Sequence, residues 1–308
     1  MFANKVMMVR PVDFKYNVET GVDNEFQHRL ALAPEQITER ALNEFCATVA
    51  NLESKGVKVM VLEKGELKGE TPDAVFPNNW FATDSKGNVY LFPMKTENRR
   101  REVRPYDAKQ LLKANGLIVG NTIKVGDEDD GLVLEGTGAI VFDHKWQLAY
   151  AALSERCDET LLNHFCRKID YQPISFRSFS SNERPIYHTN VLMSVGRDFV
   201  VACLAAIDEK DRRRFIECVQ RTGKKLIDIT FEQMEQHFCG NILELKNVDG
   251  ERVLALSKRA WAGFDEQQQA FFSARMTICA SDIETLETVG GGSMRCMLAE
   301  VFSPVAES

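Results

Sequence analysis

Apolar residues cluster in short runs along this chain, and four pairs of runs share one layout that begins with a polar residue. The pairs span residues 79–92, 135–151, 188–202 and 241–256. In each pair, a turn rich in Gly, Asn or Asp separates the two apolar runs. Runs of this length around such turns predict β-hairpins.

Helical patterns accompany these hairpins. Apolar residues at helical spacing predict helices near 161–169 and 215–219, and a further stripe covers 37–52 near the N-terminus. Gly56 is predicted to end that first helix, and the apolar run 57–62 predicts a strand after it. The repeating unit is therefore ββαβ, present about five times.

The polar residues that open the apolar runs recur at a nearly constant spacing. Asn79, Glu135, His188 and Asn241 are 56, 53 and 53 residues apart, and a further 55 residues lead to Cys296. If the modules close around an axis, these five positions converge at its centre. Packing alone explains them poorly because buried polar groups are costly unless they are paired.

Composition and charge narrow the function classes. The chain has 38 basic and 45 acidic residues, a net charge of −7, with 44% hydrophobic and 27% charged residues. This balance is typical of a globular protein and argues against a nucleic-acid partner, which would require an excess of Lys and Arg. One basic run, 99–101 with Arg104, is flanked by Glu97 and Glu102, and we expect it to be a solvated helix face.

Membrane and disulfide classes are also disfavoured. No segment approaches the ~20 apolar residues that span a bilayer, and the first residues lack the core of a signal peptide. The eight cysteines form no Cys-x-x-Cys pair, which argues against zinc ribbons, iron–sulfur sites and disulfide scaffolds. We therefore expect reduced thiols, a cytoplasmic protein, and no metal or cofactor.

Three of the convergent positions form a set suited to covalent catalysis. Cys296 follows the glycine run 290–292, where backbone can approach a ligand, and the neighbouring Arg295 favours a thiolate. Cysteine, histidine and glutamate supply a nucleophile, a proton shuttle and an orienting carboxylate. Alternatives stay open at four of the five positions: Cys296 as a buried or redox-sensitive thiol, His188 as a structural histidine, and Asn79 and Asn241 as turn residues.

Six short motifs, spread over nearly the whole chain, carry a family resemblance. They lie at 8–11, 76–80, 134–138, 187–190, 239–241 and 290–297. Together they resemble the amidinotransferase/arginine deiminase superfamily, with bacterial citrulline-utilisation hydrolases as the closest group.

This resemblance implies an α/β pentein fold, a propeller of five ββαβ modules around a pseudo-fivefold axis. That fold agrees with the repeat and predicts a single domain, 1–308. Its approximate modules are 1–70, 71–126, 127–180, 181–232 and 233–308.

The resemblance also implies roles at the site. Cys296 would be the nucleophile, His188 the acid and base, and Glu135 its partner. Members that act on a guanidinium usually carry Asp where this chain has Asn79 and Asn190. An amide both donates and accepts hydrogen bonds and suits a neutral ureido group better, so citrulline is the expected substrate, hydrolysed to ornithine, ammonia and carbon dioxide.

Other substrate contacts are assigned by the same resemblance. Asn78 and Asn241 complete the expected amide set. Some relatives place an Arg before the glycine run, where this chain has Val289. Arg295 or Arg184 is expected to bind the substrate carboxylate instead.

Two other functions stay open: a deiminase or amidinotransferase that acts on a guanidino substrate, and a non-catalytic pentein that binds a macromolecule. The expected partner is a small amino acid, with no nucleic acid and no membrane. A homodimer is left open.

Overall fold

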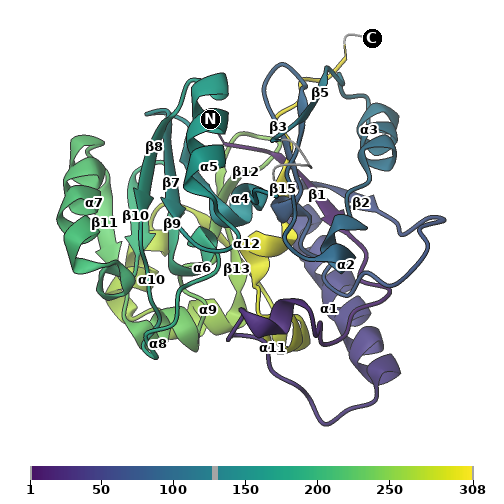
Figure 1. Ribbon diagram of the computed structural model, residues 1–308, viewed down its shortest axis with the longest axis horizontal. Helices are drawn as coiled ribbons and strands as arrows, with labels where there is room; N and C mark the ends of the chain where they lie inside the picture. Colours follow the sequence, from purple (N-terminus) through teal and green to yellow (C-terminus); the bar gives the residue numbers. More distant parts are fainter. Residues whose placement is uncertain (1, 127–130, 307–308) are drawn as a thin grey trace.

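The computed structural model describes residues 2–126 and 131–306, which form an α/β fold with five small sheets of three strands each (Figure 1). In every sheet the middle strand pairs antiparallel with one neighbour and parallel with the other. In four of the sheets this arrangement is the predicted ββαβ unit, because a hairpin supplies the antiparallel pair and a helix connects the parallel pair. Five such sheets fit a five-module arrangement.

The strands of the five sheets, in spatial order, are β15 (Ala299–Glu300), β1 (Lys5–Val9), β2 (Lys58–Leu62); β3 (Phe81–Thr83), β4 (Val89–Leu91), β5 (Thr122–Lys124); β6 (Val141–Asp143), β7 (Leu148–Ala152), β8 (Gln172–Phe176); β9 (Met193–Val195), β10 (Phe199–Ala202), β11 (Lys225–Asp228); and β12 (Leu243–Lys246), β13 (Arg252–Ser257), β14 (Thr277–Ser281). Contacts between the first strands link neighbouring sheets: β15 with β3, β6 with β9, and β9 with β12.

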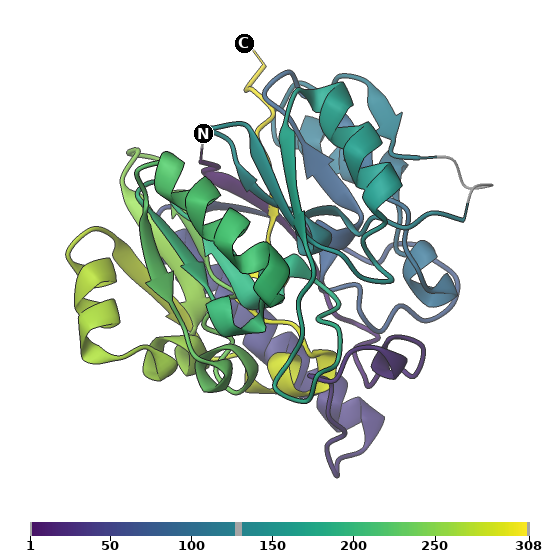
Figure 2. The ribbon, with the colours of Figure 1, turned by 60° about the vertical axis from the view of Figure 1, so that its left-hand side comes forward.

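The helices that connect the parallel strands are α1 (Pro34–Ser54), α3 (Pro105–Ala114), α5 (Glu159–Ile169), α7 (Glu209–Arg221) and, after α9 (Lys258–Gly263), α10 (Glu266–Ser273). Figure 2 shows α5 and α7, in teal and green, on the outer face turned toward the viewer. The shorter helices are α2 (Glu97–Arg100), α4 (Gly136–Ala139), α6 (Thr189–Leu192), α8 (Phe231–Glu235), α11 (Glu284–Gly290) and α12 (Met294–Met297), with 3₁₀ turns η1 (Thr20–Val22), η2 (Pro77–Asn79) and η4 (Leu204–Ala206).

Helix α5 illustrates how the pattern of the sequence becomes structure. Asp158 caps its first turn by accepting a hydrogen bond from the backbone N–H of Leu161. The apolar stripe is buried against β8 and the sheet that contains it, and each fully buried Leu or Phe contributes about 1.5–3 kcal/mol. The predicted helices over 161–169, 215–219 and 37–52 are thus confirmed.

The structure differs from the predicted hairpins at their first residues. Glu135 and His188 do not open strands; each precedes one turn of helix, α4 or α6, and the strand begins after that turn. Pro77–Asn79 and the turn around Cys296 are helical in the same way. Such a turn aims the polar side chain inward, whereas a regular strand would alternate its residues between two faces.

The last module also differs from the predicted division at 233–308. Strand β15, near the C-terminus, pairs with β1, with Val6 opposite Glu300 and Met7 opposite Ala299. One sheet is therefore built from both ends of the chain, and the ends lie near the same side of the molecule (Figures 1 and 2). A linear division by repeat length does not reveal this pairing because the two strands lie almost a whole chain apart.

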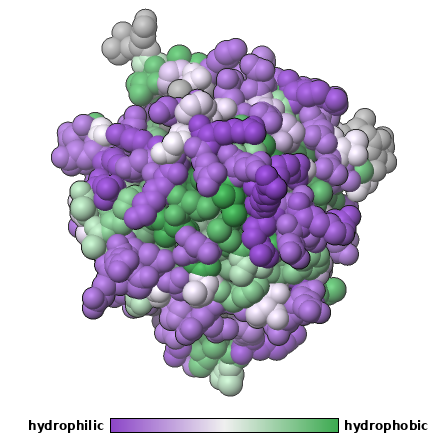
Figure 3. All heavy atoms as spheres, turned by 90° about the vertical axis from the view of Figure 1, so that its left-hand side faces the viewer, coloured by the Kyte–Doolittle hydropathy of each residue, from purple (hydrophilic) through white to green (hydrophobic). Residues whose placement is uncertain are grey.

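The surface on the side of α7 and β11 is mainly hydrophilic, with one apolar area near its middle (Figure 3). Within the described ranges, no helix has the length and apolar character needed to cross a membrane. The cytoplasmic location stays a prediction.

Candidate active site

A buried imidazole–carboxylate pair joins two modules. Nε2 of His188, just before α6, lies 2.8 Å from Oε2 of Glu135, just before α4. Both side chains are almost fully buried, and Glu135 also accepts a hydrogen bond from the backbone N–H of Lys95. Because Nε2 is held by the carboxylate, Nδ1 of His188 is the nitrogen left for other chemistry.

The charge states of the pair follow from its surroundings. Burial lowers the pKa of His188 below its ordinary value, although the hydrogen bond with Glu135 opposes this effect. Burial alone would raise the pKa of Glu135, but the Arg156 charge 3.5 Å away and the His188 contact together lower it well below its usual range. Near neutral pH the pair is thus a neutral imidazole beside a carboxylate.

Gly138 allows Asn79, which belongs to another module, to approach the His188–Glu135 pair. A Cβ atom at Gly138 would lie 2.2 Å from Nδ2 of Asn79 and 2.9 Å from Nδ1 of His188. The glycine in the 134–138 motif is therefore required by the close approach of two site residues, and any side chain would separate them.

Cys296 lies in the short helix α12 and its side chain is held by two amides. Nδ2 of Asn190 is 3.3 Å and Nδ2 of Asn241 is 3.2 Å from its Sγ atom. Its backbone N–H donates to the carbonyl of Ser293 at 3.0 Å. Burial raises the pKa of Cys296, although the contacts with Asn241, Ser293 and Asn190 oppose it. The expected effect of Arg295 is outweighed, so the sulfur is a thiol near neutral pH.

One narrow pocket brings these groups together. Its walls include Cys296, His188 and Asn79, while Glu135, Asn190 and Asn241 contact those residues from behind. All five positions of the period thus meet at one place. The remaining wall residues are Asn24, Asp73, Phe76, Arg99, Arg156, Tyr187, Gly290 and Gly292.

The structure does not bring the two expected carboxylate-binding arginines into this pocket. The Arg295 guanidinium contacts the carbonyl of Leu298 at 2.9 Å and Glu300 at 3.2 Å. Since Arg295 directly precedes Cys296 on a helical turn, its side chain leaves in a different direction. Arg184 is exposed and donates to the carbonyl of Val22. Asn78 is buried, and its Oδ1 accepts from Asn79.

Arg99 reaches the pocket instead, and here the expectation of a solvated basic run is wrong. Its side chain is 2% exposed, donates to Oδ1 of Asn79 at 2.7 Å and pairs with buried Glu102 at 2.9 Å. Arg104 is buried too, whereas Arg100 and Arg101 are exposed. Nothing in the local charge pattern separates the buried arginines from the exposed ones.

Arg156 and Asp73 are the other charged groups that the sequence patterns did not indicate. Arg156 lies 4.8 Å above the ring of Tyr187 and pairs with Asp23. Burial raises the pKa of Asp73, with the Arg99 charge opposing this effect. Neither residue belongs to a motif of the repeat, so their place in the wall of the pocket becomes known only from the folded chain.

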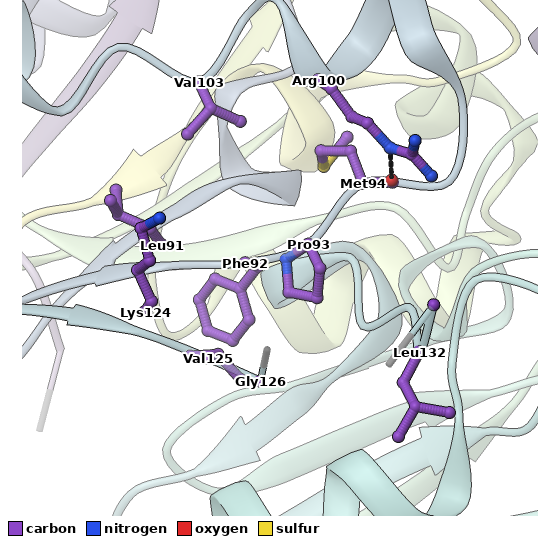
Figure 4. Close-up of a pocket in the computed structure, with 11 residues that line it drawn as sticks. Leu91, Phe92, Pro93, Met94, Arg100, Val103, Lys124, Val125, Gly126 and Leu132 are labelled. Carbon is purple, nitrogen blue, oxygen red and sulfur yellow. Dashed lines mark hydrogen bonds between the residues drawn. The ribbon is translucent and has the colours of Figure 1, made fainter. Parts of the chain in front are cut away.

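A larger cavity, of about 440 Å³, opens beside strand β4 (Figure 4). Phe92, Pro93, Val125 and Leu132 form apolar parts of its wall, and Arg100 lies at its edge, where it donates to the carbonyl of Met94. It shares no lining residue with the Cys296 pocket. Size alone therefore does not mark the site, whereas the convergence of reactive groups does.

The arrangement supports nucleophilic catalysis. A thiol held by two amides shares a pocket with an imidazole whose other nitrogen binds a carboxylate, as covalent catalysis by cysteine requires. Across 2–126 and 131–306, no three His, Cys, Asp or Glu side chains are placed to hold a metal ion.

We expect turnover to be level through neutrality and to fall in acid. A protonated thiol needs a base, here the neutral imidazole of His188, and burial lowers the pKa of His188 while it raises that of Cys296. Below the pKa of His188, kcat/KM should decrease about tenfold per pH unit. Initial rates at constant ionic strength measure this, and a profile that rises tenfold per unit above neutrality would contradict it.

Comparison with protein families gives one match over most of the chain. Residues 10–303 match the family described as N,N dimethylarginine dimethylhydrolase, eukaryotic. Comparison with curated protein sequences gave no match.

Solved structures share the fold. The N-terminal domain of ArgZ, an arginine dihydrolase from the ornithine–ammonia cycle in cyanobacteria, is 16% identical with a TM-score of 0.73, and the match covers 98% of this chain and 99% of that domain. AgrE bound to L-arginine is 17% identical with a TM-score of 0.73, over 99% of this chain and 41% of its own. A dimethylarginine dimethylaminohydrolase with an S-methyl-L-thiocitrulline adduct is 14% identical with a TM-score of 0.66, over 98% and 100%. At these identities the likeness establishes the pentein-type fold alone.

Proposed function

Because this chain belongs to the family of eukaryotic N,N-dimethylarginine dimethylhydrolases, pentein hydrolases that act on carbon–nitrogen bonds, we propose that it hydrolyses the ureido group of citrulline or a related ureido amino acid. One observation carries the choice of a ureido group. The side chains that hydrogen-bond to Sγ of Cys296 are the amides of Asn190 and Asn241, and within the described residues no carboxylate does so.

Amides suit a ureido group because both offer donors and acceptors. Oδ1 of Asn190 and Nδ2 of Asn78 are buried without a hydrogen-bond partner in the part of the chain that the structure describes. Oδ1 of Asn190, whose Nδ2 lies 3.3 Å from Sγ of Cys296, can accept from a ureido N–H, whereas Asn78 does not line the pocket. A carboxylate beside a neutral ureido oxygen would lose its hydration without gaining a charge partner.

The charged wall residues suit the other end of an amino acid. The guanidinium groups of Arg99 and Arg156 can pair with a carboxylate, and Asp73 can pair with an ammonium. Oδ1 of Asp73 has no hydrogen-bond partner among the described residues, so it has capacity for such a ligand. These three residues replace Arg295 and Arg184 in the proposal for substrate binding.

The proposed reaction has two steps. Sγ of Cys296 loses its proton to His188 and attacks the ureido carbon; the imidazole returns the proton to the departing nitrogen, releasing ornithine and leaving a carbamoyl thioester. His188 then takes a proton from water, whose oxygen attacks the thioester carbon. The C–S bond breaks, the thiol is restored, and the carbamate that leaves decomposes to ammonia and carbon dioxide.

A guanidino substrate is the second candidate because the family is named for dimethylarginine and AgrE binds L-arginine. Incubation with citrulline, arginine and N,N-dimethylarginine, followed by separate assays of ornithine and citrulline, distinguishes the two. Ornithine from citrulline supports the proposal. Citrulline formed from a guanidino substrate at a comparable rate would reject it.

Asn190→Asp should shift specificity away from a ureido group. The carboxylate cannot donate to Sγ of Cys296 as Nδ2 does at 3.3 Å, and its charge opposes the thiolate. We expect kcat/KM for citrulline to fall about a hundredfold, and the ratio of guanidino to ureido activity to rise. The matched control is Asn247→Asp, a buried asparagine in the β12–β13 turn, which should leave both activities unchanged. An unchanged ratio in Asn190→Asp would count against the amide argument.

Two features of the architecture complete the proposal. One is that the five sheets belong to a single domain, and contacts between β15 and β3, β6 and β9, and β9 and β12 link three neighbouring pairs of sheets. A homodimer remains a prediction, which a mass measurement in solution tests.

A further inference from the structure

The glycine run before Cys296 is anchored to its surroundings at three points. Asn24 and Gln27 donate to the carbonyl of Gly290, and Tyr187 donates to the carbonyl of Gly291 at 2.6 Å. The third anchor is the hydroxyl of Ser293, which donates to Oε1 of Glu287 at 2.5 Å. Three consecutive glycines have wide conformational freedom, so these anchors decide where the following turn lies.

Of the three anchors, only the hydroxyl of Ser293 belongs to a residue that itself contacts Cys296. Ser293 precedes α12, and its carbonyl accepts the backbone N–H of Cys296 at 3.0 Å. The same residue therefore binds Cys296 through its carbonyl and Glu287 through its hydroxyl. A shift of Ser293 moves Sγ of Cys296 relative to the amides of Asn190 and Asn241.

Glu287 is itself firmly held. It lies in α11, its side chain is 1% exposed, and Oε2 pairs with Nε of Arg259 from α9 at 3.2 Å. Its backbone carbonyl also accepts the N–H of Gly291. A buried carboxylate needs such partners, and here one of them is the residue that begins the turn of the nucleophile.

We propose that Glu287 is a positioning residue that sets the reactive geometry of Cys296 through the hydroxyl of Ser293. This inference rests on the proposed covalent role of Cys296. Glu287 does not line the pocket, so its effect should fall on the chemical step and leave substrate binding nearly unchanged.

The test combines Ser293→Ala, Glu287→Ala and Glu287→Gln. Ser293→Ala removes only the hydroxyl and keeps the carbonyl that binds Cys296, so it tests the link even if Glu287→Ala folds poorly. We expect each alanine variant to lower kcat about tenfold or more, with KM within about twofold. The double variant should lose no more than the larger single loss, because both changes break one link. Glu287→Gln keeps an oxygen acceptor and should stay within about threefold of wild type.

The control is Glu284→Gln on the same helix, whose side chain is 80% exposed and 4.0 Å from Arg259. It should leave kcat unchanged. Multiplicative losses in the double variant, or Ser293→Ala within about twofold of wild type, would overturn the proposal.

A measurement without substrate separates this inference from the proposed function. Thiolate absorbance, taken as the difference from Cys296→Ser, follows the titration of Cys296. Both alanine variants should raise its pKa by about one unit, and Glu287→Gln should not. If wild type turns over neither ureido nor guanidino substrates but these shifts appear, the proposed function fails while the positioning role stands. An unshifted pKa in both alanine variants would reject the positioning role.

Discussion

Replacement of Cys296 by serine should abolish turnover, with kcat reduced about 10⁴-fold or more and the fold retained. The hydroxyl is a far weaker acid than the thiol, and the neutral His188 cannot ionise it as readily. The amides of Asn190 and Asn241, now on the thiol, can donate to the serine oxygen instead. We therefore expect the free energy of unfolding to change by less than about 1 kcal/mol.

Two measurements check this expectation: the rate of ornithine release and the denaturant midpoint. Cys218→Ser is the matched control, because Cys218 is a partly buried thiol of α7 outside the pocket. It should keep full activity. Retained turnover in Cys296→Ser would refute the assignment of the nucleophile.

Gly138→Ala should reduce kcat about a hundredfold or more, because displacement of catalytic groups by about 1 Å has effects of this size. The new methyl group would lie 2.2 Å from Nδ2 of Asn79, so Asn79 or α4 must move. The Nδ1 atom of His188, 2.9 Å away, would be displaced as well. No rotamer of alanine relieves these contacts, since Cβ is fixed by the backbone.

Loss of stability must be separated from loss of geometry in this variant. Gly223→Ala serves as the control: its φ of +71° strains an alanine, but no atom lies within 4 Å of the added Cβ. It should lose about 1 kcal/mol of stability and keep its activity. Kinetics and thermal unfolding of both variants distinguish the two losses. A wild-type kcat in Gly138→Ala would contradict the close approach of Asn79 and His188 to this glycine.

Much of the architecture was predictable because it depends on local patterns. The stripe from Ile37 to Leu52 and the turn at Gly56 specify α1 and β2 without knowledge of distant residues. The period of polar residues located Glu135 and His188, which the fold places 2.8 Å apart. A repeat puts equivalent positions at equivalent places, so spacing alone can identify residues that meet.

Other features depend on which distant segments come together. The pairing of β15 with β1 joins opposite ends of the chain, and no linear period encodes it. The direction of Arg295 is set by the helical turn at Cys296, which the place of Cys296 in the period does not indicate.

Periodicity and turn chemistry are local properties, so the ββαβ modules and the five converging positions of the period follow from the sequence. Which charges face the pocket depends on the tertiary structure. Arg99 and Arg101 are two residues apart in one basic run, yet the first is buried against Asn79 and the second is exposed. Burial is a property of what packs on a segment, and for a charged residue it follows from partners far away along the chain.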